Sequence, residues 1–322
     1  MSVDNDVLMP TSDVTPRGLA KACCIKLDDI ILGGDILVIR TSKQSTSGEF
    51  LARYIRHLEQ KVLQLVSGST VFHLYPTSIQ RLALAFPSKQ EQQKIAECLS
   101  TLDELIEAES RKLDALQSHK KGLMQQLFPR AGETRPRLRF PEFQNAPEWE
   151  ENKLGSLCEL YQPQTLTASE LQMNGEYLVY GANGIIGRHD RYNHEESEIA
   201  VTCRGATCGE VTRTLPQSWI TGNAMVVRPK DERLSKDFIF HYFKNHGLKS
   251  VISGSAQPQI TRTGFAPLLF SFPEPTEQQR IATCLASLDD LIAAQSAKLE
   301  TLKIHKRGLM QQLFPSPSEA GA

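Results

Sequence analysis

Glycine-rich segments in the second half of the chain carry arginine, glutamine and threonine side chains with free hydrogen-bonding capacity. Guanidinium and amide groups pair with the edges of guanine and adenine, and cations also contact phosphates. The candidates of this kind are Asn183, Arg188, Arg204, Thr207, Arg213, Gln257, Gln259, Thr261 and Arg262. Weaker counterparts near the N-terminus are Thr11, Ser12, Arg17, Arg40 and Lys43. The alternative for each residue is a solvated loop side chain, so the elements that position them must be identified.

The sequence contains none of the common motifs of catalysis or nucleotide binding. It has no GxxxxGK loop, no HExxH or GxSxG motif and no Asn/Asp-Pro-Pro-aromatic segment. The run from Gly181 to Gly187 is GxxGxxG rather than the dinucleotide-binding GxGxxG. The acid pairs Asp103-Glu104 and Asp289-Asp290 lie in helical repeats, where a solvated face explains them better than acid–base chemistry. We therefore expect a binding protein that performs no chemistry itself.

Composition and cysteine placement narrow the class further. The chain has 322 residues, of which 40% are hydrophobic and 23% charged, and its net charge is −1. Binding to a polyanion must therefore rest on local patches or on partner subunits that add positive charge. The seven cysteines include no CxxC pair, and Cys203 and Cys208 have no histidine pair nearby, which argues against a metal site. The scattered thiols, the acidic N-terminus and the lack of an apolar run of about 18 residues predict a cytoplasmic protein without a membrane span.

A duplicated segment is the clearest feature of the sequence. The 39 residues that begin at Glu91 recur at Glu277, an offset of 186, with 26 identical positions. Both copies begin with EQQ and end with GLMQQLFP. Two copies this far apart indicate two long modules that end in the same element, rather than a solenoid of short repeats.

Each copy has the pattern of a helix with one apolar stripe. Stripe positions recur at alternating steps of 4 and 3 over about five heptads, as in a coiled coil. They are Ile95, Leu99, Leu102, Ile106, Glu109, Leu113, Leu116, Lys120, Leu123 and Leu127, and in the second copy Ile281, Leu285, Leu288, Ile292, Gln295, Leu299, Leu302, Lys306, Leu309 and Leu313. The two polar positions of each copy either fix the register of a helix pair or mark solvent-exposed turns. The other copy is the simplest partner for each helix, in an orientation that the heptads leave open.

Capping and breaking residues bound the two helices. Ser88-Lys-Gln-Glu91 and Thr276-Glu-Gln-Gln279 fit capping boxes, and Pro129 and Pro315 are expected to end the helices. A helix of about 37 residues is roughly 55 Å long.

A mixed segment with strand-like runs precedes each helix. In the second module we predict strands at 177–179, 198–203, 224–228 and 267–272 and a helix near 235–243. In the first module we predict strands at 35–40 and 82–86 and a helix at 48–58, which repeat only the later part of that order. A counterpart of Glu148–Ser197 is therefore missing from the first module.

These elements give a predicted domain organisation. It comprises a partial first domain at 1–90, a long helix at 91–129, a basic, proline-rich linker at 130–147, a second domain at 148–275, a second long helix at 276–315 and a disordered tail at 316–322. Trp149 opens the second domain, and we interpret it as a core anchor rather than a surface stacking residue.

Four motifs of the second domain, together with the duplicated helix, resemble the specificity subunits of type I restriction-modification enzymes. The motifs are YGANGIIGRHDRY (Tyr180–Tyr192), VTCRGATCGEV (Val201–Val211), WITGNAMVV (Trp219–Val227) and SGSAQPQI (Ser253–Ile260). The resemblance covers essentially the whole chain. It adds Tyr180 and Tyr192 to the candidate DNA-binding residues.

The resemblance implies an α+β fold with two globular α/β target-recognition domains, joined by two long helices packed as an antiparallel coiled coil. Each domain of such a subunit reads one half of a bipartite site in double-stranded DNA, and the helices set the gap between the halves. Two methyltransferase subunits dock on the helices, and two restriction (nuclease-translocase) subunits complete the complex. S-adenosylmethionine, ATP and magnesium are used by those partners, so no cofactor is expected in this chain.

Basic patches late in each helix are candidates for partner binding. They consist of Lys120, Lys121 and Gly122 in the first copy and of Lys306, Arg307 and Gly308 in the second. The alternative is that cations near the end of a helix simply complement its dipole.

Two other functions compete with a bipartite DNA reader. One is a coiled-coil adaptor that presents two small domains to other proteins and has no salt-dependent DNA affinity. The other is a truncated allele in which one recognition domain functions and the shortened first domain folds poorly, unless pairing with another chain rescues it.

Overall fold

The computed structural model describes residues 1–182, 184–254 and 256–314. The chain divides into two compact units, which are Met1–Leu113 with the stretch from residue 294 onward, and Asp114–Ala293. Each unit combines small, mostly antiparallel sheets with helices, so the predicted α+β class is confirmed. Within the described ranges, no helix has both the length and the apolarity that crossing a membrane requires. The tail predicted at 316–322 lies outside the described residues.

The first unit is built on a three-stranded sheet with the order β3-β1-β4. Its elements are β1 (Val7–Pro10), β2 (Ser12–Asp13), η1 (Pro16–Ala20), β3 (Cys23–Cys24), β4 (Ile36–Ile39), α1 (Gly48–His57), α2 (Glu59–Leu63), β5 (Phe72–His73), α3 (Pro76–Ile79) and the start of α4 (Lys89–Leu127). Strand β4 and helix α1 confirm the predicted strand at 35–40 and helix at 48–58.

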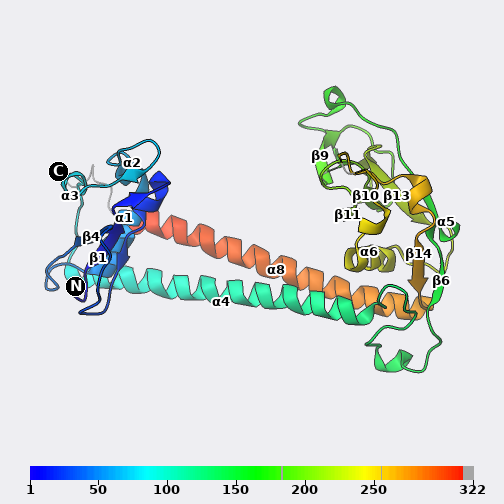
Figure 1. Ribbon diagram of the computed structural model, residues 1–322, viewed down its shortest axis with the longest axis horizontal. Coiled ribbons are helices and arrows are strands. Elements are labelled where there is room, and N and C mark those ends of the chain that lie inside the picture. Colours follow the sequence, from blue (N-terminus) through cyan, green and yellow to red (C-terminus); the bar gives the residue numbers. More distant parts are fainter. Residues whose placement is uncertain (183, 255, 315–322) are drawn as a thin grey trace. The chain divides into compact units, whose positions relative to one another are not determined.

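The second unit has a four-stranded sheet with the order β11-β10-β13-β7 and a three-stranded sheet with the order β12-β8-β9 (Figure 1). Its elements are η2 (Pro141–Phe143), β6 (Glu150–Lys153), α5 (Leu154–Leu157), β7 (Cys158–Tyr161), η3 (Ala168–Glu170), β8 (Tyr177–Gly181), β9 (Gly184–His189), β10 (Ile199–Thr202), β11 (Val211–Arg213), β12 (Trp219–Ile220), β13 (Ala224–Pro229), α6 (Lys236–His246), η4 (Lys249–Val251), α7 (Arg262–Phe265), β14 (Leu269–Phe272) and α8 (Pro275–Leu313). All four strands and the helix predicted in this module are present. Trp149 is buried against Phe128 and Phe238, as expected of a core anchor.

The two domains share one strand pairing in the same register. Strand β1 pairs with β4 in the same register as β10 with β13, so that Val7 lies opposite Ile39 as Ile199 lies opposite Val227. The arginine that follows Ile39 or Val227 forms the same ion pair in each domain, from Arg40 to Asp6 and from Arg228 to Glu198, each at 2.7 Å. The interpretation that the first module repeats the later part of the second is therefore confirmed.

A glutamine near the start of each long helix fastens that helix to its own domain. The Gln92 side chain accepts a hydrogen bond from Ser47 N (2.9 Å) and donates one to Pro87 O (2.9 Å). Gln278 makes the same two bonds in the second unit, with Ser235 N at 2.9 Å and Pro273 O at 2.7 Å. Ser47 and Ser235 are the N-caps of α1 and α6, so one amide joins two helix starts.

The ends of the long helices agree only partly with the expected signals. The Ser88 hydroxyl accepts a hydrogen bond from Glu91 N (3.3 Å), as half of a capping box requires. The capping box predicted at Thr276 is wrong because α8 already begins at Pro275. Glu274 O accepts the hydrogen bonds of Glu277 N and Gln278 N, and proline suits the first turn because it has no N–H to satisfy.

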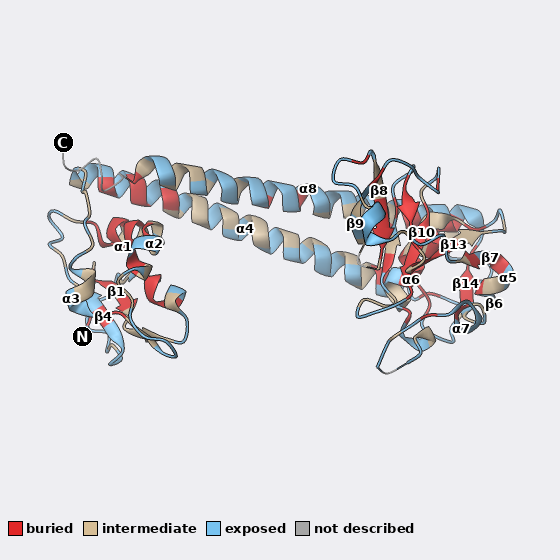
Figure 2. Cartoon of the chain, turned by 90° about the horizontal axis from the view of Figure 1, so that it is seen from above, coloured by how far each residue is buried: buried red, intermediate tan, exposed pale blue. Residues whose placement is uncertain are grey.

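The apolar stripe is confirmed in both helices. In each unit α4 and α8 lie side by side (Figure 1). They are antiparallel, because in the first unit Glu109 contacts Lys298, whereas the earlier residue Asp103 contacts the later residue Lys306. All twenty stripe positions are buried or intermediate (Figure 2). The buried ones lie near the start of each helix, at Leu127 and, in the middle of α8, at Gln295 and Leu299.

The polar breaks in the stripe are contacts between the two helices. The Gln295 amide donates hydrogen bonds to the Glu109 carbonyl (2.9 Å) and carboxylate (2.6 Å). Lys298 forms an ion pair with the same carboxylate. The bonds from Gln295 and Lys298 lower the pKa of Glu109. Lys120 pairs with Asp289, and the equivalent Lys306 pairs with Asp103. The breaks therefore fix the register and are not merely exposed turns.

The strand predicted at 82–86 is wrong. These residues belong to no strand, whereas their counterparts in β14 pair with β6, from Leu269 opposite Lys153 to Phe272 opposite Glu150. Strand β6 belongs to the segment whose counterpart is missing from the first domain, so no described residue there takes its place beside residues 82–86.

The linker after α4 is held by a buried ion pair. The Arg139 guanidinium donates to both carboxylate oxygens of Glu277 (2.9 and 2.5 Å) and to Ala146 O (2.8 Å). The side chains of Arg139 and Glu277 are only 4% and 2% exposed. A bidentate pair of this kind joins the linker to the first turn of α8.

We predict that Arg139→Met destabilises the second unit by about 3–5 kcal/mol, because Glu277 becomes an unpaired buried charge. Urea unfolding followed by tryptophan fluorescence measures this, since Trp149 and Trp219 both lie in the second unit. The control is Arg280→Met, because Arg280 lies in the same unit and is 49% exposed in its ion pair with Glu142. A loss for Arg139→Met as small as that for Arg280→Met would contradict the prediction.

We also predict that His241 makes the second unit acid-sensitive. Burial, together with the nearby Lys120 charge, lowers the pKa of His241 to about 4. The unfolded chain therefore binds the proton first as the pH falls, and stability that is full above about pH 6.5 decreases by about 2 kcal/mol between pH 7 and pH 5. His241→Leu should flatten this dependence in urea titrations at the two pH values. An unchanged slope in the variant would show that other groups cause the sensitivity.

Candidate nucleic-acid interface

Three loops of the second unit meet at the end of strand β10. Ala182, in the turn between β8 and β9, accepts hydrogen bonds on its carbonyl oxygen from the hydroxyls of Thr202 (2.8 Å) and Thr207 (2.7 Å). Gly205 N donates to Pro258 O (3.2 Å) and so joins the loop after β10 to the loop before α7. We call this group the loop cluster; it consists of Ala182 with the described residues of 202–209 and 253–262.

The loop before α7 has a fixed conformation. Ser253 and Gln259 exchange two backbone hydrogen bonds of 2.8 Å, and Ile260 N donates to Cys203 O at 3.0 Å. Gly254 has φ of +82°, and a Cβ there would lie 2.6 Å from Gln257 O, so glycine is required. Backbone bonds therefore fix the loop before α7.

The side chains that the cluster presents are those suited to base edges and phosphates. Arg204, Gln257, Gln259, Thr261 and Arg262 are all exposed. Among the described residues, none forms an ion pair or a side-chain hydrogen bond with the guanidinium of Arg204 or of Arg262. Two such cations beside two amides match the donors and acceptors that duplex DNA presents.

Other predicted residues of the second domain lie away from the loop cluster. Arg213 is opposite Ile199, at the far end of β10, and forms an ion pair with Asp237. Arg188 lies opposite Leu178 and donates to the carbonyls of Gly175 and Glu176.

The two tyrosines differ from each other, and one predicted residue is not described. Tyr180 is 4% exposed, and its hydroxyl accepts from Leu215 N at 3.1 Å. Tyr192 is exposed and packs edge-on against Tyr177 at 5.0 Å. Asn183 lies outside the described residues. The roles of all these residues in DNA contact stay predictions.

Glycines at positions 181, 184, 187 and 205 would let the backbone approach a phosphate, and two of the four have an open face. A Cβ on Gly184 or Gly205 would meet nothing within 4 Å. A Cβ on Gly181 would lie 2.8 Å from the Ile186 side chain, and one on Gly187 would lie 3.3 Å from Leu171. The last two glycines therefore serve internal packing.

The first domain repeats the backbone of this cluster with different side chains. Ser12 pairs with His73 as Arg204 pairs with Gln259, and Leu74 N donates to Thr11 O at 2.9 Å. Thr11 and Ser12 thus occupy the places of Cys203 and Arg204. The predicted cations carry acid partners, since Arg17 pairs with Glu59, Arg40 with Asp6 and Lys43 with Asp4.

The cysteines near the cluster are structural. Cys203 accepts a hydrogen bond from the Gln162 amide (2.9 Å) and donates to Asn223 O (3.1 Å), and burial raises the pKa of its thiol. In the described part of the chain, no group of three or more His, Cys, Asp or Glu side chains is placed to hold a metal ion.

The cations of the basic patches predicted to bind partners fall into two groups. Lys120 and Lys306 are held by Asp289 and Asp103, whereas Lys121 and Arg307 are exposed. Neither helix has a basic residue in its last turn, so the helix-dipole explanation fails.

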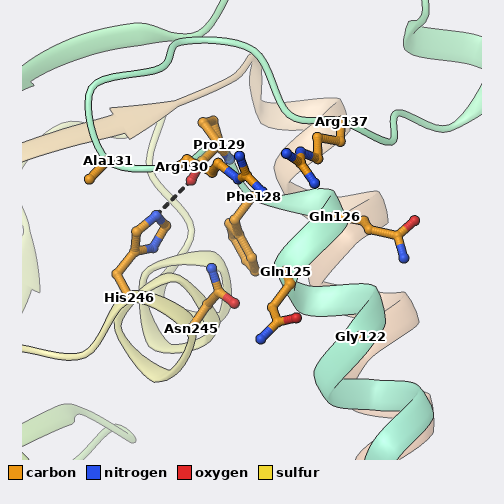
Figure 3. A pocket seen from close by; sticks show the side chains of 10 residues that line it. All are labelled: Gly122, Gln125, Gln126, Phe128, Pro129, Arg130, Ala131, Arg137, Asn245 and His246. Atoms are coloured by element: carbon orange, nitrogen blue, oxygen red, sulfur yellow. Dashed lines mark hydrogen bonds between the residues drawn. The ribbon is translucent and has the colours of Figure 1, made fainter.

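Gly122 and Gly308 have an open face, because a Cβ on either would meet nothing within 4 Å. Figure 3 shows that Gly122 lines a pocket of about 670 Å³ with Gln125, Arg130 and His246, where the imidazole contacts Pro129 O at 2.8 Å. Partner binding at these patches stays a prediction.

Sequence reasoning missed the residues that position the cluster. The Thr202 hydroxyl holds Ala182, and the Gln162 amide holds Cys203 from 41 positions away. The periodicity of Thr202 predicts only a strand end, and Gln162 has no local signal at all.

The fold and the cluster define a class of protein. Each unit combines an α+β domain with a stretch of an antiparallel helix pair, and a loop cluster of the second domain exposes donors and acceptors of the kinds that pair with base edges and phosphates.

Comparisons with known proteins agree on one family. The model of the type I restriction modification DNA specificity domain matches residues 22–118 and 147–303. The type I restriction enzyme MjaVIII specificity subunit of Methanocaldococcus jannaschii is 22% identical over 317 residues, which cover 88% of this chain and 73% of that protein. The EcoprrI specificity subunit of Escherichia coli is 28% identical over 148 residues, or 45% of this chain and 37% of that protein.

Solved structures show the same fold. The crystal structure of the type I restriction-modification S subunit from M. genitalium superposes with a TM-score of 0.70 at 14% identity, covering 98% of this chain and 84% of that one. A chain from a study of complex assembly and conformational transition of the type I R-M system gives 0.57 at 17% identity, covering 98% and 82%. Because the family model matches more than half of the chain, the chain belongs to the type I restriction-modification DNA specificity family.

We predict that Arg204→Ala and Arg262→Ala each weaken DNA binding by about 1–3 kcal/mol if the guanidinium reads a base. If it contacts a phosphate instead, the slope of log affinity against log salt should fall by about one. Fluorescence anisotropy of the complex with the methyltransferase partner, at several salt concentrations, measures both quantities.

The matched control is Arg213→Ala, because its guanidinium is already paired with Asp237 and lies away from the loop cluster. We expect its affinity to stay within about twofold of the parent, which is about 0.4 kcal/mol. A larger loss for Arg213→Ala than for Arg204→Ala would contradict the assignment of the interface to the loop cluster.

Proposed function

We propose that this chain selects the DNA sequence at which a type I restriction-modification complex acts, and that it reads a bipartite site. The observation that carries the proposal is the shared architecture of the two domains. Each has the same strand register, and in each a glutamine (Gln92 or Gln278) joins the long helix to the domain. A bipartite DNA site has two halves, and each half requires its own recognition domain. The second domain contributes the loop cluster, and the first contributes its counterpart around Thr11 and Ser12.

We further propose that the chain performs no chemistry itself and works in the cytoplasm with partner subunits. Two methyltransferase subunits would bind the long helices near Lys121, Gly122, Arg307 and Gly308, and two restriction subunits would complete the complex. S-adenosylmethionine, ATP and magnesium would be used by those partners. The near-neutral charge of the chain supports this arrangement, since much of the positive field that attracts DNA must then come from the other subunits.

We predict that DNA from cells carrying this subunit with its methyltransferase partner is methylated at one sequence with two fixed halves separated by a constant gap. Single-molecule sequencing of modified bases maps such sites, and cells without the subunit are the control. A mobility-shift assay of the assembled complex should show the same sequence preference. Sequence-independent binding would defeat the proposal, and loss of all salt-dependent DNA affinity would favour the adaptor.

A further inference from the structure

The sheet of the first domain has an unoccupied edge where the second domain has a strand. In the second domain β7 covers the outer edge of β13, with Leu160 opposite Val227 and Tyr161 opposite Val226. Among the described residues of the first unit, no strand pairs with the outer edge of β4. Val38 is consequently 38% exposed, whereas its counterpart Val226 is 0% exposed. An open edge presents unpaired backbone groups that accept another strand.

A cavity of about 610 Å³ lies beside this edge. Most of the side chains that line it are apolar, as in a domain core. Strand β4, helices α1 and α3 and residues 82–86 line it. The corresponding place in the second domain is filled by Leu154, Leu157 and Leu160 of the β6–α5–β7 segment. Phe86, on the wall of the cavity, is 46% exposed, whereas its counterpart Phe272 is 2% exposed.

The cavity can accommodate a segment like the one that fills the second domain. In the second domain the surrounding side chains include Phe243, Phe265 and Phe270. Their counterparts in the first domain are Ile55, Ile79 and Leu84, which are smaller. The same leucines therefore have more room beside these three positions in the first domain.

Charge at the open edge is also complementary to such a segment. In the second domain the strand register places Glu159 of β7 opposite Arg228 of β13. Arg40 holds the place of Arg228 in the first domain, and its side chain is 55% exposed despite its ion pair with Asp6. An incoming strand with a carboxylate at this register would meet a cation.

We propose that the first domain is completed by a strand–turn–strand segment of a separate polypeptide, which has the pattern of Glu150–Tyr161 and adds to the open edge of β4. A second copy of this chain is a poor donor, because its own Leu154, Leu157 and Leu160 are buried in its second domain. The proposal concerns how the first domain is completed and stands apart from whether the second domain binds DNA.

The test uses the full chain and a fluorescent synthetic peptide with the sequence of residues 148–163, kept under reducing conditions. We expect saturable binding with one site per chain in an anisotropy titration. Changing Leu157→Asp or Leu160→Asp in the peptide should reduce the affinity at least tenfold, because these side chains face the core. A peptide with Lys153→Ala, an exposed position, should bind like the parent.

Hydrogen exchange with mass spectrometry identifies where the peptide binds. We expect slower exchange at residues 36–41 and 82–86 and no change at 224–229, where the edge is already covered. The absence of saturable binding would overturn the proposal. Undiminished binding of the Leu160→Asp peptide, or protection confined to other segments, would also overturn it.

Discussion

Each domain is closed by an aromatic ring that comes from the opposite copy of the repeat. Phe314, after α8, stacks on Tyr54 at 5.1 Å and packs against Phe50 at 5.4 Å in the first unit. Phe128, after α4, lies 5.6 Å from Phe238 and 5.8 Å from Tyr242 in the second unit. Burying such a ring contributes about 1.5–3 kcal/mol. Because each helix begins on its own domain and ends in the core of the other, the two helices must run in opposite directions.

Charges in the stripe select the same orientation. An antiparallel pair places the lysine late in one helix beside the aspartate early in the other, and both Lys120–Asp289 and Lys306–Asp103 form. In a parallel, in-register pair Lys120 would face Lys306, and Asp103 would face Asp289. Burial raises the pKa of Asp103, but hydrogen bonds from Lys306 and Arg53 outweigh it and lower the pKa below its usual value. The polar positions thus exclude the wrong orientation, which leucines alone would permit.

The structural features that could be predicted from the sequence are those that depend on a local residue pattern. The stripe, the strands of the second module and the resemblance between modules all follow from spacing. The strand at 82–86 was wrongly predicted because a strand also needs a partner strand. The residue pattern of the segment itself does not show whether that partner is present. The loop cluster depends on backbone bonds such as Gly205 to Pro258, which no local pattern records. Residue type alone likewise cannot separate Arg204, which is free of acid partners among the described residues, from Arg213, which is held by Asp237.

The discontinuous first unit has a consequence for synthesis on the ribosome. The second unit is one continuous stretch, Asp114–Ala293, but the first needs residues 294–314 to supply half of its helix pair and the Phe314 ring. About 200 residues separate Leu113 from Phe314, so at 5–20 residues per second the nascent N-terminal domain waits on the order of ten seconds or more. The aromatic face of α1 is open for that interval, while the later-made domain can already fold. The domain that is translated first is therefore the last to be completed. During the interval before Phe314 is made, the nascent chain most needs protection from aggregation.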